Sequence, residues 1–271
     1  MPAALERAMA DLVFGPAFEP HDQAAVEAWL ARAEVEADDR KAILDDGVER
    51  LLVYRALVRG TLREALECAI PRTMARLGPV FDEYFDRFLR ERGPESRYLR
   101  LVTREYLDFV EPSWKSDARV PSYMKDLAEH EAVQIEIASR SARPDEQESA
   151  ELDLDRPVAF IEAARLMRYG HAVHLLPDDT LDRTPPEAGP TALFVYRNPE
   201  HEVRYLELSP LAADILERLL AGHALGAALR GASGRTEGPL DPDVLSGTTQ
   251  LLFDLAERGA LLGAAPSEGA R

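Results

Sequence analysis

The segment Tyr54–Val110 has the sequence YRALVRGTLREALECAIPRTMARLGPVFDEYFDRFLRERGPESRYLRLVTREYLDFV. Its apolar residues recur at helical spacing, and Pro71, Gly78 and Gly93-Pro94 interrupt the pattern. Proline and glycine at such points end one helix and begin the next. The segment therefore predicts a series of short amphipathic helices. Because it contains no nucleophile-and-base pair, no metal-ligand spacing and no phosphate loop, we interpret it as a packing or recognition module.

Aromatic and aliphatic side chains form the apolar stripes of the last two predicted helices. The stripe after Pro79 places its apolar residues three and four positions apart, which is typical of a helix face turned to a core. The same spacing in the next helix predicts that Tyr98 and Leu99 face inward together with Val102 and Tyr106. An aromatic series at this spacing indicates core packing rather than a stacking platform; its members are Tyr84, Phe85, Phe88, Tyr98 and Tyr106.

Residues upstream of this segment predict further helices. The first 20 residues are weakly patterned, and we expect a loosely docked N-terminal arm at 1–20, followed by a helical domain at 21–140. A long helix is expected from Asp38 to Arg59, with Gly60 at its end. The single cysteine, Cys68, falls inside a helical pattern, which favours a buried, chemically inert thiol.

Composition excludes several classes of protein. The 271-residue chain is long enough for two domains, and it has no apolar run of 18 residues and no signal-like start. A cytoplasmic protein without membrane contact is expected. The net charge of −17 opposes nucleic-acid binding, which depends on Lys and Arg. Even the least acidic region, 50–118, carries 13 Lys and Arg against 11 Asp and Glu.

The pattern changes after the helical domain. Residues 141–156 are polar, acidic and punctuated by proline, and we interpret them as an interdomain linker. Alternating apolar residues then predict strands, and helices follow them. The expected fold class is α+β: an N-terminal all-helical domain precedes a small C-terminal α+β domain at 157–263, either winged-helix-like or a peptide-recognition module. A flexible tail is expected at 264–271.

A hairpin is the clearest feature of the second domain. The sequence ALFVYRNPEHEVRYLEL at 192–208 alternates apolar residues, and Asn198-Pro199 begins its turn. If an edge of this sheet is open, an extended peptide can pair with it through main-chain hydrogen bonds. The residues predicted to bind such a peptide are Leu193, Val195, Arg197, Val203 and Tyr205.

Histidines and acidic residues offer weak candidates for chemistry. His171 and His174 lie in a strand-like run, where residues three apart point to opposite faces, so we do not expect them to share a metal. The helical run Glu129-His130-Glu131 is expected on a solvated face. No catalytic residue and no metal ligand is predicted in this chain.

The order of sequence motifs in this chain resembles that of a known family. The first block runs from Tyr54-Arg55 through Leu57-Val58 and Gly60-Thr61-Leu62-Arg63 to Pro71. Leu77-Gly78, Phe81, Phe88-Leu89, Pro94, Ser96, Tyr98-Leu99, Tyr106 and Phe109-Val110 follow in order, and Tyr123-Met124-x-Asp126-Leu127-Ala128-x-x-Glu131 forms a third block. These blocks are similar to a bacterial family of unknown function that has carried the label of a DNA-binding domain. His171–Pro177, Leu193–Arg197 and Leu211–Leu220 are more weakly similar to its C-terminal region.

Members of that family include the partner subunit of the methanobactin-modifying enzyme, which pairs with a TIM-barrel multinuclear non-haem iron oxidase and helps present a ribosomally made precursor peptide. The resemblance implies that this chain is a recognition subunit that binds the leader of such a peptide and docks an oxidase. Iron would belong to the oxidase, and this chain would hold no cofactor. The residues expected to dock the partner are Tyr54, Arg55, Arg59 and Arg63.

The chain departs from the family pattern in two places. Ala132 stands where an aromatic residue is expected after Glu131, and the loop at 180–190 is long and rich in proline. Two alternatives to a recognition subunit remain. One is a transcription regulator with a winged helix, which the net charge of −8 over 151–271 disfavours. The other is a standalone enzyme, for which the sequence offers only unordered acids and histidines.

Overall fold

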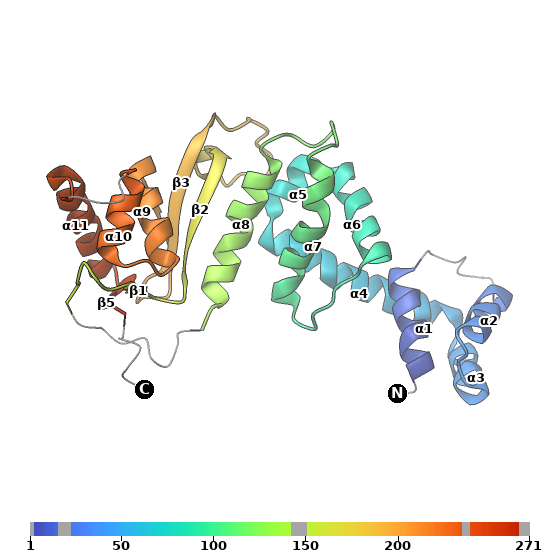
Figure 1. The fold of residues 1–271 in the computed structure, drawn as a ribbon. Coiled ribbons are helices and arrows are strands. Elements are labelled where there is room, and N and C mark those ends of the chain that lie inside the picture. The colour runs from blue at the N-terminus through green and yellow to red at the C-terminus, as the bar shows by residue number, and fades with distance from the viewer. Residues whose placement is uncertain (1–2, 16–22, 142–150, 235–238, 266–271) are drawn as a thin grey trace. The chain divides into compact units, whose positions relative to one another are not determined.

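The computed structural model describes residues 3–15, 23–141, 151–234 and 239–265 (Figure 1). It divides into two compact units. The first comprises Met1–Lys125 with Asp179–Leu181, and the second comprises Asp126–Asp178 with Asp182–Arg271. The first unit is helical and the second carries the strands, so the predicted α+β class is confirmed. The division falls at Lys125, before the expected linker at 141–156, and residues 142–150 of that linker lie outside the described residues.

Helices make up the regular structure of the first unit. They are α1 (Ala3–Phe14), α2 (Gln23–Arg32), α3 (Ala37–Asp46), α4 (Val48–Ala69), α5 (Pro71–Leu77), α6 (Pro79–Glu91) and α7 (Leu99–Trp114), and α8 (Met124–Ser139) begins there. Pro71 and Pro79 stand in the first turns of α5 and α6, as expected, because proline lacks only an N–H that has no helical partner there. The predicted break at Gly60 is wrong. The chain breaks instead at Gly47, whose φ of 91° suits glycine, and α4 continues through Gly60.

The N-terminal residues form part of the core rather than a loose arm. Helix α1 buries Leu12 and Val13, and Leu12 packs in a cluster with Leu30. The indole N–H of Trp29 donates to the Asp11 carboxylate over 2.6 Å. The expectation of a loosely docked arm is therefore wrong for residues 3–14, and residues 16–20 lie outside the described residues.

Most of the predicted aromatic stripe is buried between α6 and α7. The Tyr106 ring lies 5.4 Å from that of Phe81 and 5.7 Å from that of Phe88. Burial raises the pKa of the Tyr106 phenol. Tyr98 and Leu99, however, are exposed, because they lie at the start of α7, beyond the part that packs. Cys68 is also exposed, so the prediction of a buried thiol is wrong.

A three-stranded antiparallel sheet organises the second unit, in the order β2 (Ala164–His171), β3 (Ala188–Arg197), β4 (Val203–Glu207). The predicted hairpin at 192–208 is confirmed as β3 and β4. The remaining elements are β1 (Val158–Phe160) paired with β5 (Leu261–Ala264), the 3-10 helix η1 (Val173–Leu175), α9 (Pro210–Leu220), α10 (Leu225–Ala232) and α11 (Pro242–Glu257). Ala264 ends β5, and residues 266–271 of the expected tail lie outside the described residues.

Different helices pack against the two faces of the sheet (Figure 1). Phe194 and Tyr196 of β3 belong to a core cluster with Leu216 and other residues of α9, α10 and α11. The opposite face lies against α8, since the ring of His130 contacts Tyr169 of β2. His130 and Glu131 are consequently buried, which corrects the expectation of a solvated face. The central strand β3 is therefore buried between helices along much of its length, whereas every residue of β4 is half-buried or exposed.

Candidate functional site

The backbone of β3 is already paired on both sides. The N–H of Arg197 donates to the carbonyl of Ala163 over 2.9 Å, on the β2 side. Residues of β3 two apart share this direction, because hydrogen-bonding groups alternate along an antiparallel strand. The peptide groups of Leu193 and Val195 therefore also point to β2, with which they are in register. No peptide can add to β3 without displacing a neighbouring strand.

Strand β4 is an edge of the sheet. The N–H of Leu208 donates to the carbonyl of Ala192, and the N–H of Asn198 donates to that of Glu202, each over 2.9 Å. Even-numbered residues of β4 thus bond to β3, and by alternation Val203, Tyr205 and Glu207 turn their peptide groups outward. Among the described residues, the peptide groups of Val203 and Glu207 meet no further strand.

The five residues predicted to bind a peptide all lie on one face of the sheet, because they alternate along the hairpin. That face is the one against α8. Leu193 and Val195 are completely buried there, and the Arg197 guanidinium donates to the carbonyl of Ala138 over 2.9 Å. Leu193 and Val195 are interior, and Arg197 is partly buried with its guanidinium bound to α8. Val203 and Tyr205 lie on the edge strand, so the predicted peptide site stays a prediction that is now confined to β4.

The other edge of the sheet, on β2, is capped at its end by α8. The N–H of Gly170 donates to the Asp126 carboxylate over 2.9 Å, and Nδ1 of His171 lies 2.7 Å from the same oxygen. Gly170 lies at the register shift between Tyr169 and His171, and its N–H bonds to Asp126 rather than to β3. Asp126 thus takes the place that a strand would need there, which leaves β4 as the better edge for a peptide.

Aromatic and acidic groups surround β4. The His130 ring lies 5.1 Å from that of Tyr205, and its Nδ1 lies 3.5 Å from the hydroxyl of Tyr169. Burial raises the pKa of the Tyr169 phenol, so it remains a neutral hydrogen-bonding group. Nε2 of His174 lies 3.6 Å from the carboxylate of Glu207. Of these three rings, that of Tyr205 is exposed and suits contact with peptide side chains, whereas His130 and Tyr169 are buried behind it.

The two histidines of the predicted strand-like run take separate partners. His171 ends β2, whereas His174 lies on η1, so the expected single strand is wrong at this point. Their closest carboxylates are different ones, from Asp126 and Glu207. Among the described residues, no group of three or more His, Cys, Asp or Glu side chains is arranged to hold a metal ion.

A separate apolar hollow of about 600 Å³ lies elsewhere on the second unit. Its walls include Leu154, Leu225, Leu245, Phe253 and Leu261. The phenyl ring of Phe253 is more than half exposed. The lining carries few polar groups to orient a ligand, so the hollow offers apolar contact area only.

The residues predicted to dock a partner have mostly internal contacts. Arg55 donates to the carbonyl of Leu12, Arg59 pairs with Asp86, and Arg63 pairs with Asp82. These arginines join α4 to α1 and α6 within the chain, and their role in docking a partner stays a prediction. Tyr54 differs from them, because its side chain is exposed. It lies on an open strip of α4 with two further exposed apolar residues, Val53 and Leu57.

Sequence reasoning missed several residues of the site. Glu207 continues the alternation of Val203 and Tyr205, so the spacing alone could have placed it on the outward side of β4. Asp126 was visible only as part of a family motif. Its contact with Gly170 and His171 joins residues 44 and 45 positions apart, which no local pattern reveals.

Two comparisons add to this geometry. No curated protein matches the chain significantly, and no described helix is long and apolar enough to cross a membrane. A family model described as the HvfC C-terminal domain matches residues 162–256. The matched residues contain β2, β3, β4, α9 and α10 completely, and nearly all of α11. The region that contains the sheet, its β4 edge and its helical cover is therefore similar to the HvfC C-terminal domain.

Proposed function

We propose that this chain is a non-catalytic partner subunit of a multinuclear non-haem iron oxidase, and that it presents a ribosomally made precursor peptide to that enzyme. The observation that carries the proposal is the HvfC C-terminal domain match, which covers the sheet and its edge. HvfC proteins are partners of multinuclear iron oxidases, and the family resemblance of the first unit points the same way.

The leader of the precursor peptide would bind along β4 as a further strand. Main-chain hydrogen bonds to Val203 and Glu207 would supply affinity, and alternate side chains of the leader would meet opposite faces of the sheet. On the α8 side they would meet the exposed ring of Tyr205, which packs against His130. On the α9 side they would meet Leu206. This mode needs no catalytic group from the chain.

Iron belongs to the oxidase in this proposal. The support is the donor set of this chain: His171 and His174 have separate carboxylate neighbours, and the described residues hold no group of three metal-ligating side chains. The chain would position the peptide, and the oxidase would carry out the chemical modification. Holding the peptide beside the oxidase raises the local concentration of the residue that is modified.

Co-expression with an oxidase encoded by a neighbouring gene tests the proposal. We expect the two proteins to co-purify, a fluorescent leader peptide to bind the full chain, and the oxidase to modify its precursor much faster with the chain present. If the proteins do not associate at micromolar concentration and the oxidase alone modifies the peptide equally well, the proposal is wrong.

The DNA-binding alternative receives no support from the family match. A titration of the full chain against duplex DNA at low salt serves as a control, since protein–DNA affinity rises steeply as salt falls. We expect no saturable binding, because the strand-bearing half of the chain is acidic.

A further inference from the structure

Five consecutive exposed residues lie at the start of α7 and just before it: Arg97, Tyr98, Leu99, Arg100 and Leu101. We call them the 97–101 patch. The exposed fractions of Tyr98, Leu99 and Leu101 are 46%, 48% and 43%. Tyr98 and Leu99 continue the apolar stripe whose next members, Val102 and Tyr106, are buried. The helical stripe thus extends one turn beyond the core that covers it, which leaves apolar area for another surface.

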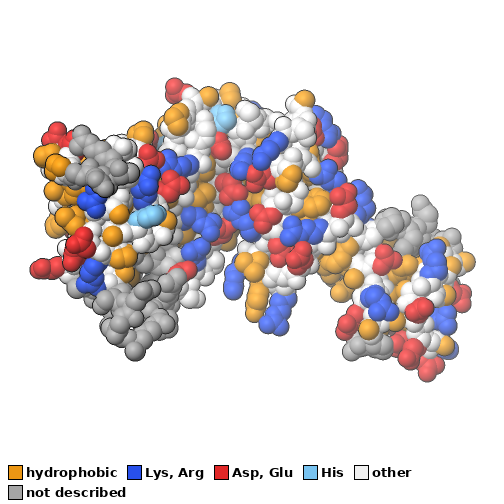
Figure 2. All heavy atoms as spheres, viewed as in Figure 1, with side chains coloured by type: hydrophobic (Ala, Val, Ile, Leu, Met, Phe, Trp, Pro, Cys, Tyr) orange, Lys and Arg blue, Asp and Glu red, His pale blue; other side chains and the backbone are white. Residues whose placement is uncertain are grey.

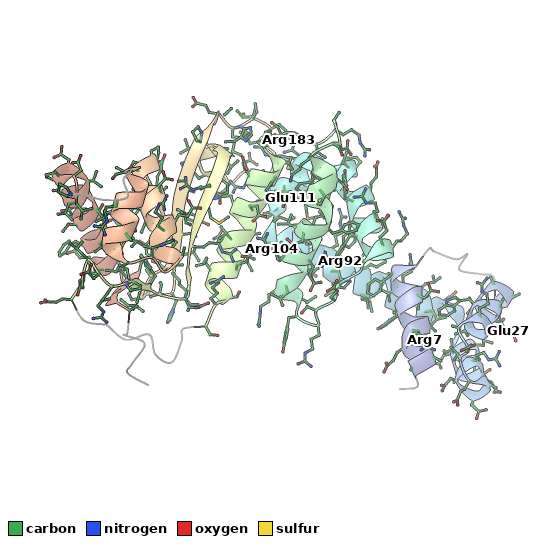
Figure 3. The ribbon with its side chains drawn as sticks, in the orientation of Figure 1. Arg7, Glu27, Arg92, Arg104, Glu111 and Arg183 are labelled. Atoms are coloured by element: carbon green, nitrogen blue, oxygen red, sulfur yellow. The ribbon has the colours of Figure 1, made fainter. Side chains whose placement is uncertain are left out.

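Two arginines of the patch lie against its aromatic ring. The Arg97 and Arg100 guanidinium carbons are 5.2 Å and 4.9 Å from the centre of the Tyr98 ring. Neither arginine forms an ion pair with a described residue. Other arginines of the same unit do: Arg92, labelled in Figure 3, pairs with Glu95, and Arg119 pairs with Glu83. Two positive charges therefore remain uncompensated in a chain of net charge −17.

The patch does not serve the stability of its own helix. Positive charges at a helix N-terminus are unfavourable, because the helix dipole places its positive end there. The preceding loop is held by other groups: the Glu105 carboxylate accepts from the N–H groups of Glu95 and Ser96 over 2.8 Å and 3.0 Å, and the Ser96 hydroxyl accepts from Tyr98 N–H. The exposed side chains can be exchanged without disturbing these contacts.

We propose that the 97–101 patch is the surface of the first unit that docks an acidic, partly apolar face of the oxidase. This inference rests on the proposed function. Tyrosine and arginine are the side chains most enriched among residues that dominate binding energy at protein interfaces. The chain's many acidic groups do not prevent such contact, because exposed charges farther than about 8 Å are screened at physiological salt. On the face of this unit shown in Figure 2, hydrophobic, basic and acidic side chains are intermingled.

The test measures the affinity of the full chain for its co-purified oxidase at 0.15 M salt, the physiological strength, and across a salt series. The variant Arg97→Glu/Arg100→Glu reverses the charge of the 97–101 patch from positive to negative. The control Lys41→Glu/Arg50→Glu makes the same change in net charge at two exposed cations of the same unit. A second patch variant, Tyr98→Ala/Leu99→Ser, removes apolar area and leaves the charge intact. Denaturation curves check that all variants fold.

We expect charge reversal to weaken binding by about 30-fold or more, the size of a single interface hot spot, and to flatten the salt dependence. The control should stay within about threefold. The apolar variant should weaken binding while the salt dependence persists. If the wild type binds and the reversed variant binds equally well, the patch proposal is wrong and the proposed function stands. If the wild type does not bind at all, both are wrong. Binding of duplex DNA that depends on Arg97 and Arg100 would also overturn the protein-docking assignment.

Discussion

The Asp126 carboxylate lies 2.7 Å from Nδ1 of His171, and the same oxygen accepts from the peptide N–H of Gly170. These contacts tie α8 to the end of β2. Because α8 is held there, it covers one face of the sheet, and Leu193 and Val195 of the predicted hairpin residues are completely buried. The structure of the candidate site thus depends on a contact between residues 45 positions apart.

Replacing Asp126 should loosen the second unit. The variant Asp126→Ala leaves the N–H of Gly170 and the ring of His171 without their acceptor, and we expect a loss of about 1–3 kcal/mol in the free energy of unfolding. Asp126→Asn keeps an acceptor oxygen and should lose less. Urea denaturation measures both. Equal stability of Asp126→Ala and the wild type would contradict the role of this contact.

Arg59 should behave as a structural residue. It donates to the carbonyl of Val13 and pairs with Asp86, with 19% of its side chain exposed. We expect Arg59→Ala to lower the free energy of unfolding by about 1.5–3 kcal/mol, the range for hydrogen bonds to charged groups. The control Arg50→Ala removes an exposed pair with Asp46 and should cost at most about 0.5 kcal/mol. Unchanged stability with weaker oxidase binding in Arg59→Ala would contradict this structural role and support the predicted docking role.

Acid should destabilise the first unit through Glu111, which lies on α7 (Figure 3). A hydrogen bond from Lys125, followed by its charge and that of Lys115, holds the pKa of this carboxyl below its ordinary value. A lowered folded-state pKa stabilises the protein above the unfolded value of about 4.3, and this stabilisation is lost as the pH falls through the folded-state pKa. Glu111→Gln should therefore be less stable than the wild type at pH 7 and equally stable in strong acid. Denaturation curves between about pH 7 and pH 3 check this, since the ordinary pKa lies inside that window.

Proline at the outward positions of β4 should block peptide binding without unfolding the sheet. Proline is tolerated in an edge strand where its missing N–H faces solvent. We expect Val203→Pro to reduce the affinity for the leader peptide by about tenfold or more, with the sheet retained. Arg204→Pro removes a bond to β3 and should destabilise the second unit. Fluorescence anisotropy and thermal melts separate the two effects.

A control for the site of peptide binding comes from the apolar hollow. Phe253→Ala removes an exposed ring there and leaves β4 untouched. We expect leader affinity to remain within about twofold, since no β4 contact changes. A large loss in Phe253→Ala with no loss in Val203→Pro would move the peptide from the β4 edge to the hollow.

The thiol of Cys68 should react in the folded protein. Its side chain is exposed on α4, so a thiol reagent should modify it without denaturant. Cys68→Ser should change the free energy of unfolding by no more than about 0.5 kcal/mol, as for other surface substitutions. Protection of the thiol until the protein unfolds would contradict the exposed position.

Much of the fold could be predicted from the sequence because helix starts and turns depend on residues that are close together in the chain. Pro71 and Pro79 mark helix starts through their missing N–H, and the alternation at 192–208 with its Asn198 turn predicts the hairpin. The break between α3 and α4 was misplaced because Gly47 and Gly60 differ only in backbone conformation. At Gly47 the chain needs a positive φ, and at Gly60 it does not.

The sequence by itself determined the α+β class, the hairpin and the fact that Leu193, Val195, Arg197, Val203 and Tyr205 share one face, since a strand has a period of two. Only the tertiary structure decided which of them a ligand can reach. Strand order made β4 an edge and β3 a central strand, and α8 covered the shared face. Likewise the helical period predicted the stripe through Tyr98 and Tyr106, but packing buried only Tyr106. Burial depends on contacts between distant segments, and those are formed only when the chain folds.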